Sequence, residues 1–313
     1  VDVLLFEALL RAMPLSCKLI MVGDSDQLPS VGAGNLLKDL IDSEVVPAVK
    51  LTQIFRQAEE SSIVKNAHLI NNGEMPDLKQ KDNDFFFLQR LDYDEITETI
   101  IELQKDRLPK TYGFSPLDDI QVLCPTRKGP IGVYELNKKL QAVLNPPSKY
   151  VSELRMPNYI FRENDKVMQT KNNYDITWER EDEKGSGIFN GDIGKIIEVD
   201  RLSGTVKIDF EGRICTYNSA MLENLELAYA VTVHKSQGSE FDVVILPLFG
   251  GYDKLYFRNL LYTAVTRAKK LLIIVGSAKR VEFMIANNRR TCRYTCLKDM
   301  LVKDSYDEYE ATI

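Results

Sequence analysis

The chain has 313 residues, of which 44 % are hydrophobic and 27 % are charged, and its formal net charge is −6. This length allows two or three domains with a sizeable core, and the composition is ordinary for a globular protein. The negative charge argues against a surface covered in nucleic-acid-binding cations, although it permits a local basic groove. The longest apolar runs, such as residues 271–275, are too short to cross a bilayer, so we expect a cytoplasmic protein without a membrane partner.

The cysteines and histidines give little support for a metal site. Five cysteines are scattered along the chain without a CxxC pair, and only His68 and His234 could complete a site. We therefore expect reduced thiols and no bound metal.

Hydrophobic spacing predicts the elements in chain order. Helical spacing predicts helices over residues 1–14, 35–41, 94–107, 132–144 and 259–268. Short apolar runs predict strands over residues 18–22, 85–88, 120–124, 243–246 and 271–275. Strands that alternate with helices indicate right-handed βαβ units and a parallel sheet. The first helix pattern begins at Val1 with neither a cap nor a lead-in, which suggests that sequence precedes it.

The pattern changes between about residues 157 and 225. Strands are expected over 166–170, 192–199 and 205–210, and the last alternates apolar with polar residues as a half-buried antiparallel strand does. The charged, glycine-bearing stretch 179–187 predicts a mobile loop. We interpret the region as a small all-β module inserted into an α/β domain, and we expect the acidic tail from Asp304 to be frayed.

A first polar cluster follows the strand predicted over residues 18–22. Residues 23–32 read GDSDQLPSVG, and ligands of open α/β sheets bind just past strand ends. In such a place Gln27 could orient a water molecule or touch a terminal phosphate. A polar loop built from turn residues is the alternative.

Two arginines have the chemistry of phosphate contacts. Arg56 follows Ile54 and Phe55 at the start of a helix, and Arg267 is expected on a helix that leads into a buried strand. The guanidinium group is a planar, permanently charged donor for phosphate oxygens, and Arg267 could reach across a cleft as an arginine finger. A surface salt bridge remains the alternative for Arg56.

A third cluster, residues 232–241, reads TVHKSQGSEF and precedes a buried strand. Its hydroxyls, amide, lysine and glycine can present donors to a sugar–phosphate chain. Taken alone, His234 would more often have a structural role.

These clusters together resemble a known family. GDxxQLPSVG, IFRQ, VHKSQGSEF and YTAVTRA are similar to helicase motifs III, IV, V and VI, in that order. Their wording resembles the RecD-like DNA helicases of superfamily 1B, which include the α subunit of exodeoxyribonuclease V, and the likeness runs from Asp2 to about Leu301. It implies an α/β fold: a RecA-like, P-loop NTPase-type parallel-sheet domain with an inserted SH3-like β-barrel. Residues 1–50 would end the first motor domain, 51–156 and 226–313 would form the second, and 157–225 would be the barrel.

The resemblance also implies an activity: an ATP-dependent helicase that moves 5′ to 3′ on single-stranded DNA, uses Mg²⁺, and serves DNA repair and recombination. Carried over by motif, Gln27 would sense the γ-phosphate, and Arg56 and Arg267 would neutralise charge on the transferred group. Further contacts to the nucleotide would come from Gly23, Asp24, Gly238, Glu240 and Tyr262. Contacts to DNA would come from Thr126, Arg127, Thr232, His234, Lys235 and Ser236. The loop CPTRKG that holds the first two is equally well explained as a basic turn. Whether the protein works alone or within a nuclease–helicase complex stays open.

The chain departs from the family pattern in one respect. It contains neither the GxxxxGK[S/T] phosphate loop nor the Asp-Glu pair that such enzymes need for phosphates and Mg²⁺. Gly194-Lys195 is no substitute, because Phe189 stands where the first glycine belongs. We therefore predict that the 313 residues alone do not hydrolyse ATP. The alternatives are a non-catalytic nucleic-acid-binding or docking module, which would have no use for Arg56 and Arg267, and an RNA helicase or conjugative relaxase motor.

Overall fold

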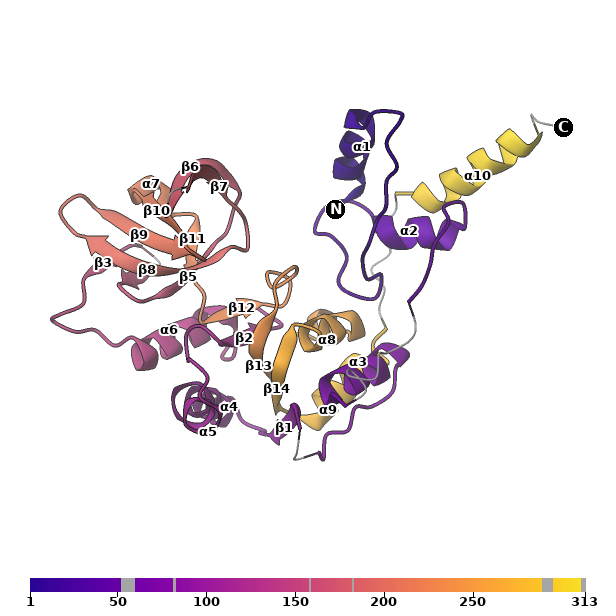
Figure 1. Cartoon of the computed structure of the whole chain (residues 1–313). Helices are drawn as coiled ribbons and strands as arrows, with labels where there is room; N and C mark the ends of the chain where they lie inside the picture. Colours follow the sequence, from indigo (N-terminus) through magenta and orange to yellow (C-terminus); the bar gives the residue numbers. More distant parts are fainter. Residues whose placement is uncertain (52–59, 81–82, 158, 182, 289–294, 311–313) are drawn as a thin grey trace.

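The structure is a computed structural model that describes residues 1–51, 60–80, 83–157, 159–181, 183–288 and 295–310, with the backbone alone from 304 onward (Figure 1). Its helices are α1 (Val3–Ala12), α2 (Leu36–Ser43), α3 (Ser62–Asn72), α4 (Tyr93–Glu102), the π-helical turn η1 (Leu103–Arg107), α5 (Leu108–Tyr112), α6 (Val133–Leu144), α7 (Ser219–Leu222), the 3₁₀ turn η2 (Asp253–Leu255), α8 (Arg258–Val265), α9 (Ala278–Ala286) and α10 (Leu297–Glu310). Its strands are β1 (Phe85–Gln89), β2 (Ile120–Cys124), β3 (Glu153–Arg155), β4 (Ile160–Arg162), β5 (Lys166–Gln169), β6 (Asn173–Arg180), β7 (Glu183–Ile188), β8 (Ile193–Asp200), β9 (Thr205–Phe210), β10 (Arg213–Tyr217), β11 (Leu225–Leu227), β12 (Ala230–Thr232), β13 (Phe241–Leu248) and β14 (Ala268–Gly276).

A five-stranded sheet with the order β1-β14-β13-β2-β12 forms the centre of the α/β part, and all of its pairings are parallel. This confirms the α/β expectation. β13 and β14 are buried along most of their length because helices cover both faces of the sheet. Alternate side chains point to opposite layers: Val243 and Ile245 pack with α4 and α6, whereas Val244 and Leu246 pack with α3, α8 and α9.

The region between α6 and β12 forms a separate antiparallel sheet with the order β11-β5-β8-β9-β10-β6-β7, which Figure 1 shows as a curved module beside the parallel sheet. The predicted strands over 166–170, 192–199 and 205–210 correspond to β5, β8 and β9. β5 and β11, the strands through which the chain enters and leaves this sheet, are hydrogen-bonded neighbours with Val167 opposite Leu227.

The loop expected over residues 179–187 is wrong for most of its length, because residues 179–180 end β6 and residues 183–187 belong to β7. The two strands pair as a hairpin in which Trp178 lies opposite Gly185. A side chain at Gly185 would meet the indole of Trp178 at 2.4 Å, so the glycine that suggested a loop makes room for a cross-strand ring. The charges also pair across the hairpin, since Lys184 Nζ lies 2.6 Å from Glu179 Oε1.

Two buried charged residues lie where this antiparallel sheet joins the α/β part. Asp165 accepts hydrogen bonds from Tyr229 Oη and Asn145 Nδ2 at 2.7 Å each, and from Gln141 Nε2 at 2.6 Å. Burial raises the pKa of Asp165 although these donors oppose the shift. The neighbouring Lys166 is 8 % exposed and donates to Ile120 O at 3.4 Å, and burial lowers its pKa to about 8.

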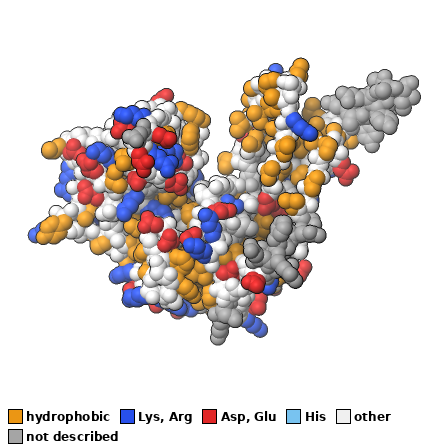
Figure 2. Space-filling model, in the orientation of Figure 1, with side chains coloured by type: hydrophobic (Ala, Val, Ile, Leu, Met, Phe, Trp, Pro, Cys, Tyr) orange, Lys and Arg blue, Asp and Glu red, His pale blue; other side chains and the backbone are white. Residues whose placement is uncertain are grey.

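The N-terminal lobe, residues 1–50, contrasts with this packing. α1 confirms the first predicted helix, but the helix is capped after all, because Asp2 Oδ1 accepts from Leu5 N at 2.8 Å. None of its residues is buried, and Figure 2 shows hydrophobic side chains gathered on this lobe. The strand predicted over residues 18–22 is wrong: the segment is irregular, and Ile20 and Val22 are 77 % and 94 % exposed. An apolar run becomes a strand only beside another strand, and no described segment pairs with it.

The C-terminal tail is also more ordered than predicted, because α10 continues past Asp304 to Glu310 and contacts α2. None of the helices in the described ranges has the length and apolar character that crossing a bilayer requires.

Candidate functional site

The first polar cluster lies along α8, although more than 200 residues separate them in sequence. Leu28 N donates to Thr263 Oγ1 at 2.9 Å, and Asn259 Nδ2 donates to Asp26 O at 2.7 Å. The adjoining loop contributes a third bond, from Gln237 Nε2 to Leu28 O at 2.7 Å. Motifs III, V and VI therefore form one site.

Arg267 occupies the turn between α8 and β14 rather than the helix predicted for it, because α8 ends at Val265. Only 7 % of the residue is exposed. Its Nη2 donates to Gln27 Oε1 at 2.7 Å, its Nη1 to Ser239 O at 3.1 Å, and its Nε to Thr263 O at 3.3 Å. All three acceptors are uncharged, and among the described residues no carboxylate comes within ion-pair distance of this guanidinium. Burial lowers the pKa of Arg267, yet a guanidinium keeps its proton in proteins.

Gln27 is held in a fixed orientation beside Arg267. Its Nε2 donates to Asp24 Oδ2 at 3.1 Å, which directs its carbonyl oxygen to the guanidinium. The same carboxylate oxygen accepts from Tyr262 Oη at 3.0 Å. Burial, with Asp24 nearby, raises the pKa of Tyr262, so the phenol remains a donor. The structure thus brings together four residues predicted for the nucleotide site: Asp24, Gln27, Tyr262 and Arg267.

The remaining residues predicted to contact nucleotide are less closely engaged. Gly238 has a φ of 86°, and a side chain there would meet nothing within 4 Å, so its backbone is open to an incoming group. The carboxylate of Glu240 is 60 % exposed and lies 3.8 Å from Lys269 Nζ. Gly23 packs closely against Leu37. Arg56 lies outside the described residues.

The residues predicted to contact DNA occupy two loops that leave the sheet side by side, since Thr232 at the end of β12 pairs with Cys124 at the end of β2. His234 is exposed. Lys235 Nζ donates to Thr170 O at 3.1 Å and to Asn190 Oδ1, so it links its loop to the antiparallel sheet. Ser236 is 1 % exposed and its hydroxyl donates to Val233 O at 2.9 Å. In this conformation its role is therefore to stabilise the shape of the loop.

The second loop also lies against the antiparallel sheet. Arg127 forms an ion pair with Glu226 and stacks over the ring of Tyr134 at 5.2 Å. Thr126 Oγ1 donates to Lys128 O at 3.0 Å and so closes the basic turn. Arg127 and Lys235 therefore connect the two loops of the α/β part to the inserted module.

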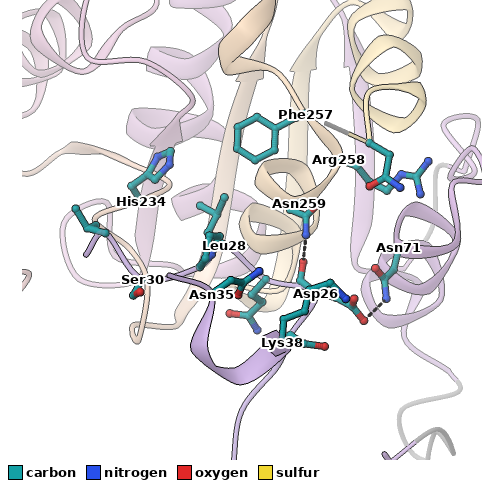
Figure 3. Close-up of a pocket in the computed structure, with 15 residues that line it drawn as sticks. Asp26, Leu28, Ser30, Asn35, Lys38, Asn71, His234, Phe257, Arg258 and Asn259 are labelled. Atoms are coloured by element: carbon teal, nitrogen blue, oxygen red, sulfur yellow. Dashed lines mark hydrogen bonds between the residues drawn. The ribbon is translucent and has the colours of Figure 1, made fainter. Parts of the chain in front are cut away.

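Sequence reasoning missed the amides of Asn71 and Asn259, and it expected the Gln237 amide to face a sugar–phosphate chain rather than the first polar cluster. Asn259 and Gln237 each donate to the backbone of the first cluster, and Asn71 Nδ2 donates to Asp26 Oδ2 at 3.0 Å. These residues also lie on or near a pocket between the first cluster, α2, α3 and α8 (Figure 3). Asn259 precedes the YTAVTRA segment by three residues, but an isolated amide on a helix carries no signal of its own.

Comparisons with known proteins find that this chain is similar to helicases. Residues 136–210 match the SH3 domain of ATP-dependent RecD-like DNA helicases, residues 227–275 the C-terminal domain of UvrD-like helicases, and residues 1–87 an AAA domain. The chain is 35 % identical over 294 residues to the ATP-dependent RecD2 DNA helicase of Deinococcus radiodurans, covering 94 % of this chain and 37 % of that protein. It is 30 % identical over 316 residues to the RecBCD enzyme subunit RecD of Mycobacterium tuberculosis, covering 95 % and 51 %. A solved structure of Pif1 helicase from Bacteroides with ADP-AlF3 and single-stranded DNA aligns with a TM-score of 0.46 at 19 % identity, over 91 % of this chain and 66 % of that one.

The parallel sheet, the inserted antiparallel module and the joined motifs define a motor domain of the superfamily 1 helicase type. Within that class, the chain belongs to the RecD-like helicases. It spans between a third and about half of the length of these two relatives.

Proposed function

We propose that this chain is the part of an ATP-driven DNA helicase that senses the terminal phosphate of ATP and contacts the translocated strand, moving 5′ to 3′. The observation that carries the proposal is Arg267: a guanidinium that is 7 % exposed and donates only to uncharged oxygens. Glu240 and Asp24 favour this charge from farther away, but neither forms an ion pair with it in the described structure. A buried charge without an ion-pair partner is costly, and binding an anion relieves that cost. Helicases of this family use ATP, and its phosphate tail is such an anion.

The residues present fit the phosphate end of ATP. Gln27 Oε1 and the guanidinium of Arg267 already face each other, so a phosphoryl oxygen that approached them would replace one neutral acceptor with a charged one. Asp24 and Tyr262 hold the Gln27 amide in position from behind. When bound, Mg²⁺ would neutralise charge on the phosphates, and we assign it to groups outside this chain. We likewise propose residues 1–50 as the end of the first motor domain, 51–156 with 226–313 as the second, and 157–225 as the inserted barrel.

For DNA, we propose the two loops that leave β2 and β12 together. Arg127 and His234 are exposed on them, and Lys235 Nζ donates to Thr170 O of the antiparallel module at 3.1 Å. Thr232 Oγ1 accepts from Lys235 N at 3.3 Å. A strand that follows both loops would therefore also pass beside the barrel. Lys235 and Arg127 would contribute charge to the phosphates, whereas Ser236 would act through the shape of its loop.

The test is DNA-stimulated ATP hydrolysis. In the full-length protein, Arg267→Ala should lower turnover by about 10³-fold or more, with single-strand affinity changed only a few fold. Lys270→Ala, which removes an exposed cation paired with Asp242, is the matched control and should turn over ATP normally. The 313-residue chain alone should show no turnover.

Equal loss of turnover and DNA affinity in Arg267→Ala would indicate a structural role for this residue and contradict the proposal. DNA-stimulated hydrolysis by the 313-residue chain would contradict the assignment of phosphate binding to groups outside it.

A further inference from the structure

The pocket in Figure 3 shares Gln27 with the phosphate site, but Asp24, Tyr262 and Arg267 do not line it. It lies between residues 25–31, the start of α2, the end of α3 and the start of α8. The rings of Phe257 and His234 stand on either side of Leu28 in that view. Because His234 belongs to the loop proposed to follow DNA, the pocket opens beside the proposed strand path.

The polar groups of this pocket include amides, hydroxyls, one carboxylate and two cations, Lys38 and Arg258. Each cation has a partner other than Asp26, because Lys38 Nζ lies 2.9 Å from Asp42 Oδ2 and Arg258 Nε donates to Ile285 O at 2.8 Å. Asp26 accepts from Asn71 Nδ2 through Oδ2 at 3.0 Å, and its backbone oxygen accepts from Asn259 Nδ2 at 2.7 Å. Both bonds use the amide nitrogens, so the carbonyl oxygens of Asn71 and Asn259 remain acceptors for a ligand. Asn35, at the start of α2, makes no capping bond with its side chain.

The carboxylate decides which part of a DNA strand can enter. Asp26 is half-buried, and Lys50 Nζ, the cation it pairs with, lies as far as 4.0 Å away. A phosphate placed beside this carboxylate would be repelled, whereas an exocyclic amino group would donate to it. The ring of Phe257, half-buried against the core, offers a face on which a base can stack.

We infer that this pocket takes one nucleobase of the bound strand, stacked on Phe257, and that Asp26 favours bases that carry an exocyclic amino group. The inference rests on the proposed function, because it deepens the DNA contact proposed there. It predicts that the protein distinguishes bases, preferring cytosine over thymine at one position.

The test compares binding of oligo-dC and oligo-dT of equal length to the full-length protein by fluorescence anisotropy at fixed salt. We expect oligo-dC to bind about fivefold more tightly or better, and Asp26→Asn to bring the ratio of the two dissociation constants near one. Asparagine retains the acceptor oxygen for Asn71, so the fold is preserved. Asp39→Asn, which removes the same charge from α2 outside the pocket, should leave the ratio at its wild-type value. Phe257→Leu should weaken both oligonucleotides about fivefold or more by removing the stacking face.

Three outcomes would overturn the inference. If both oligonucleotides bind and Asp26→Asn leaves their ratio unchanged, the pocket holds no base while the proposed function stands. If Asp39→Asn changes the ratio as much as Asp26→Asn, the preference comes from overall charge rather than from the pocket. If neither oligonucleotide binds at all, the proposed DNA contact fails and the base pocket fails with it.

Discussion

Two of the cations that this molecule holds almost entirely out of solvent, Arg267 and Lys166, lie in different regions and are held by different chemistry. Arg267, beside α8, has three donors engaged by oxygens at 2.7 to 3.3 Å. Lys166, where the antiparallel sheet joins the α/β part, reaches one carbonyl at 3.4 Å. The lysine can release its proton, and burial lowers its pKa to about 8, whereas the arginine stays charged. A site that must hold a positive charge for an anion needs the arginine, and a sheet junction can tolerate the lysine.

Among the changes that test this comparison, the largest effect should come from placing a carboxylate within ion-pair distance of Arg267. Gln27→Glu would place a carboxylate at the position now 2.7 Å from its Nη2. The new ion pair would occupy the phosphate sensor, so ATP turnover of the full-length protein should fall by about 10²–10³-fold. Gln27→Met, which removes the amide without adding charge, should also lower turnover. Gln27→Glu should lower turnover more than Gln27→Met, because its carboxylate both pairs with Arg267 and repels the phosphate. Turnover near the wild-type level in Gln27→Glu would refute this interpretation of Arg267.

At the sheet junction, removing the buried charge of Lys166 should increase the stability of the protein. At neutral pH the protonated Lys166 is disfavoured by burial, and the pKa change from 10.5 to about 8 corresponds to about 3 kcal/mol. Lys166→Met should therefore raise the free energy of unfolding at pH 7 by about 1–3 kcal/mol, measured by urea denaturation. Because the folded-state pKa is depressed, wild-type stability should rise as pH increases from about 8 toward 10.5. The variant should lack this rise, and a variant less stable than wild type at pH 7 would show that the lysine is held favourably.

A smaller effect is expected at Lys235, which lies between the two regions. Lys235→Ala should weaken single-strand binding and reduce the slope of log affinity against log salt by about 0.7, the contribution of one neutralised phosphate. Lys207→Ala, on the antiparallel sheet and paired with Glu198 at 2.6 Å, is the matched control and should leave the slope unchanged. An unchanged slope in Lys235→Ala would remove this residue from the DNA path and leave it the role of joining the loop to Thr170 and Asn190.

The sequence predicted the elements whose stability is local or that lie in a complete sheet. β13 and β14 are continuous apolar runs, and each has strands on both sides, so composition alone predicted them correctly. Residues 18–22 have the same composition and form no strand, because pairing depends on a neighbour that apolar composition cannot reveal. The hairpin at Trp178 and Gly185 was missed for the converse reason: its stability comes from a cross-strand contact.

The candidate site divides in the same way. The motif residues Gln27, Tyr262 and Arg267 were predicted from their wording and meet in the structure. The uncharged acceptors of Arg267 were not predictable, since two of them are the backbone oxygens of Thr263 and Ser239. Nor was the acceptor-rich pocket around Asp26, which forms only when segments near residues 26, 71 and 259 meet.

The antiparallel module begins and ends at hydrogen-bonded neighbours, β5 and β11, and the buried Asp165 ties its entrance to α6 and to Tyr229. A module whose two ends lie together can be gained or lost as a unit, because its removal leaves only a short distance to bridge between the flanking elements of the α/β part. In evolutionary terms, the motor and its appendage can diverge at separate rates. The polar cluster around Asp165 would then be the part of the junction that any inserted module has to fit.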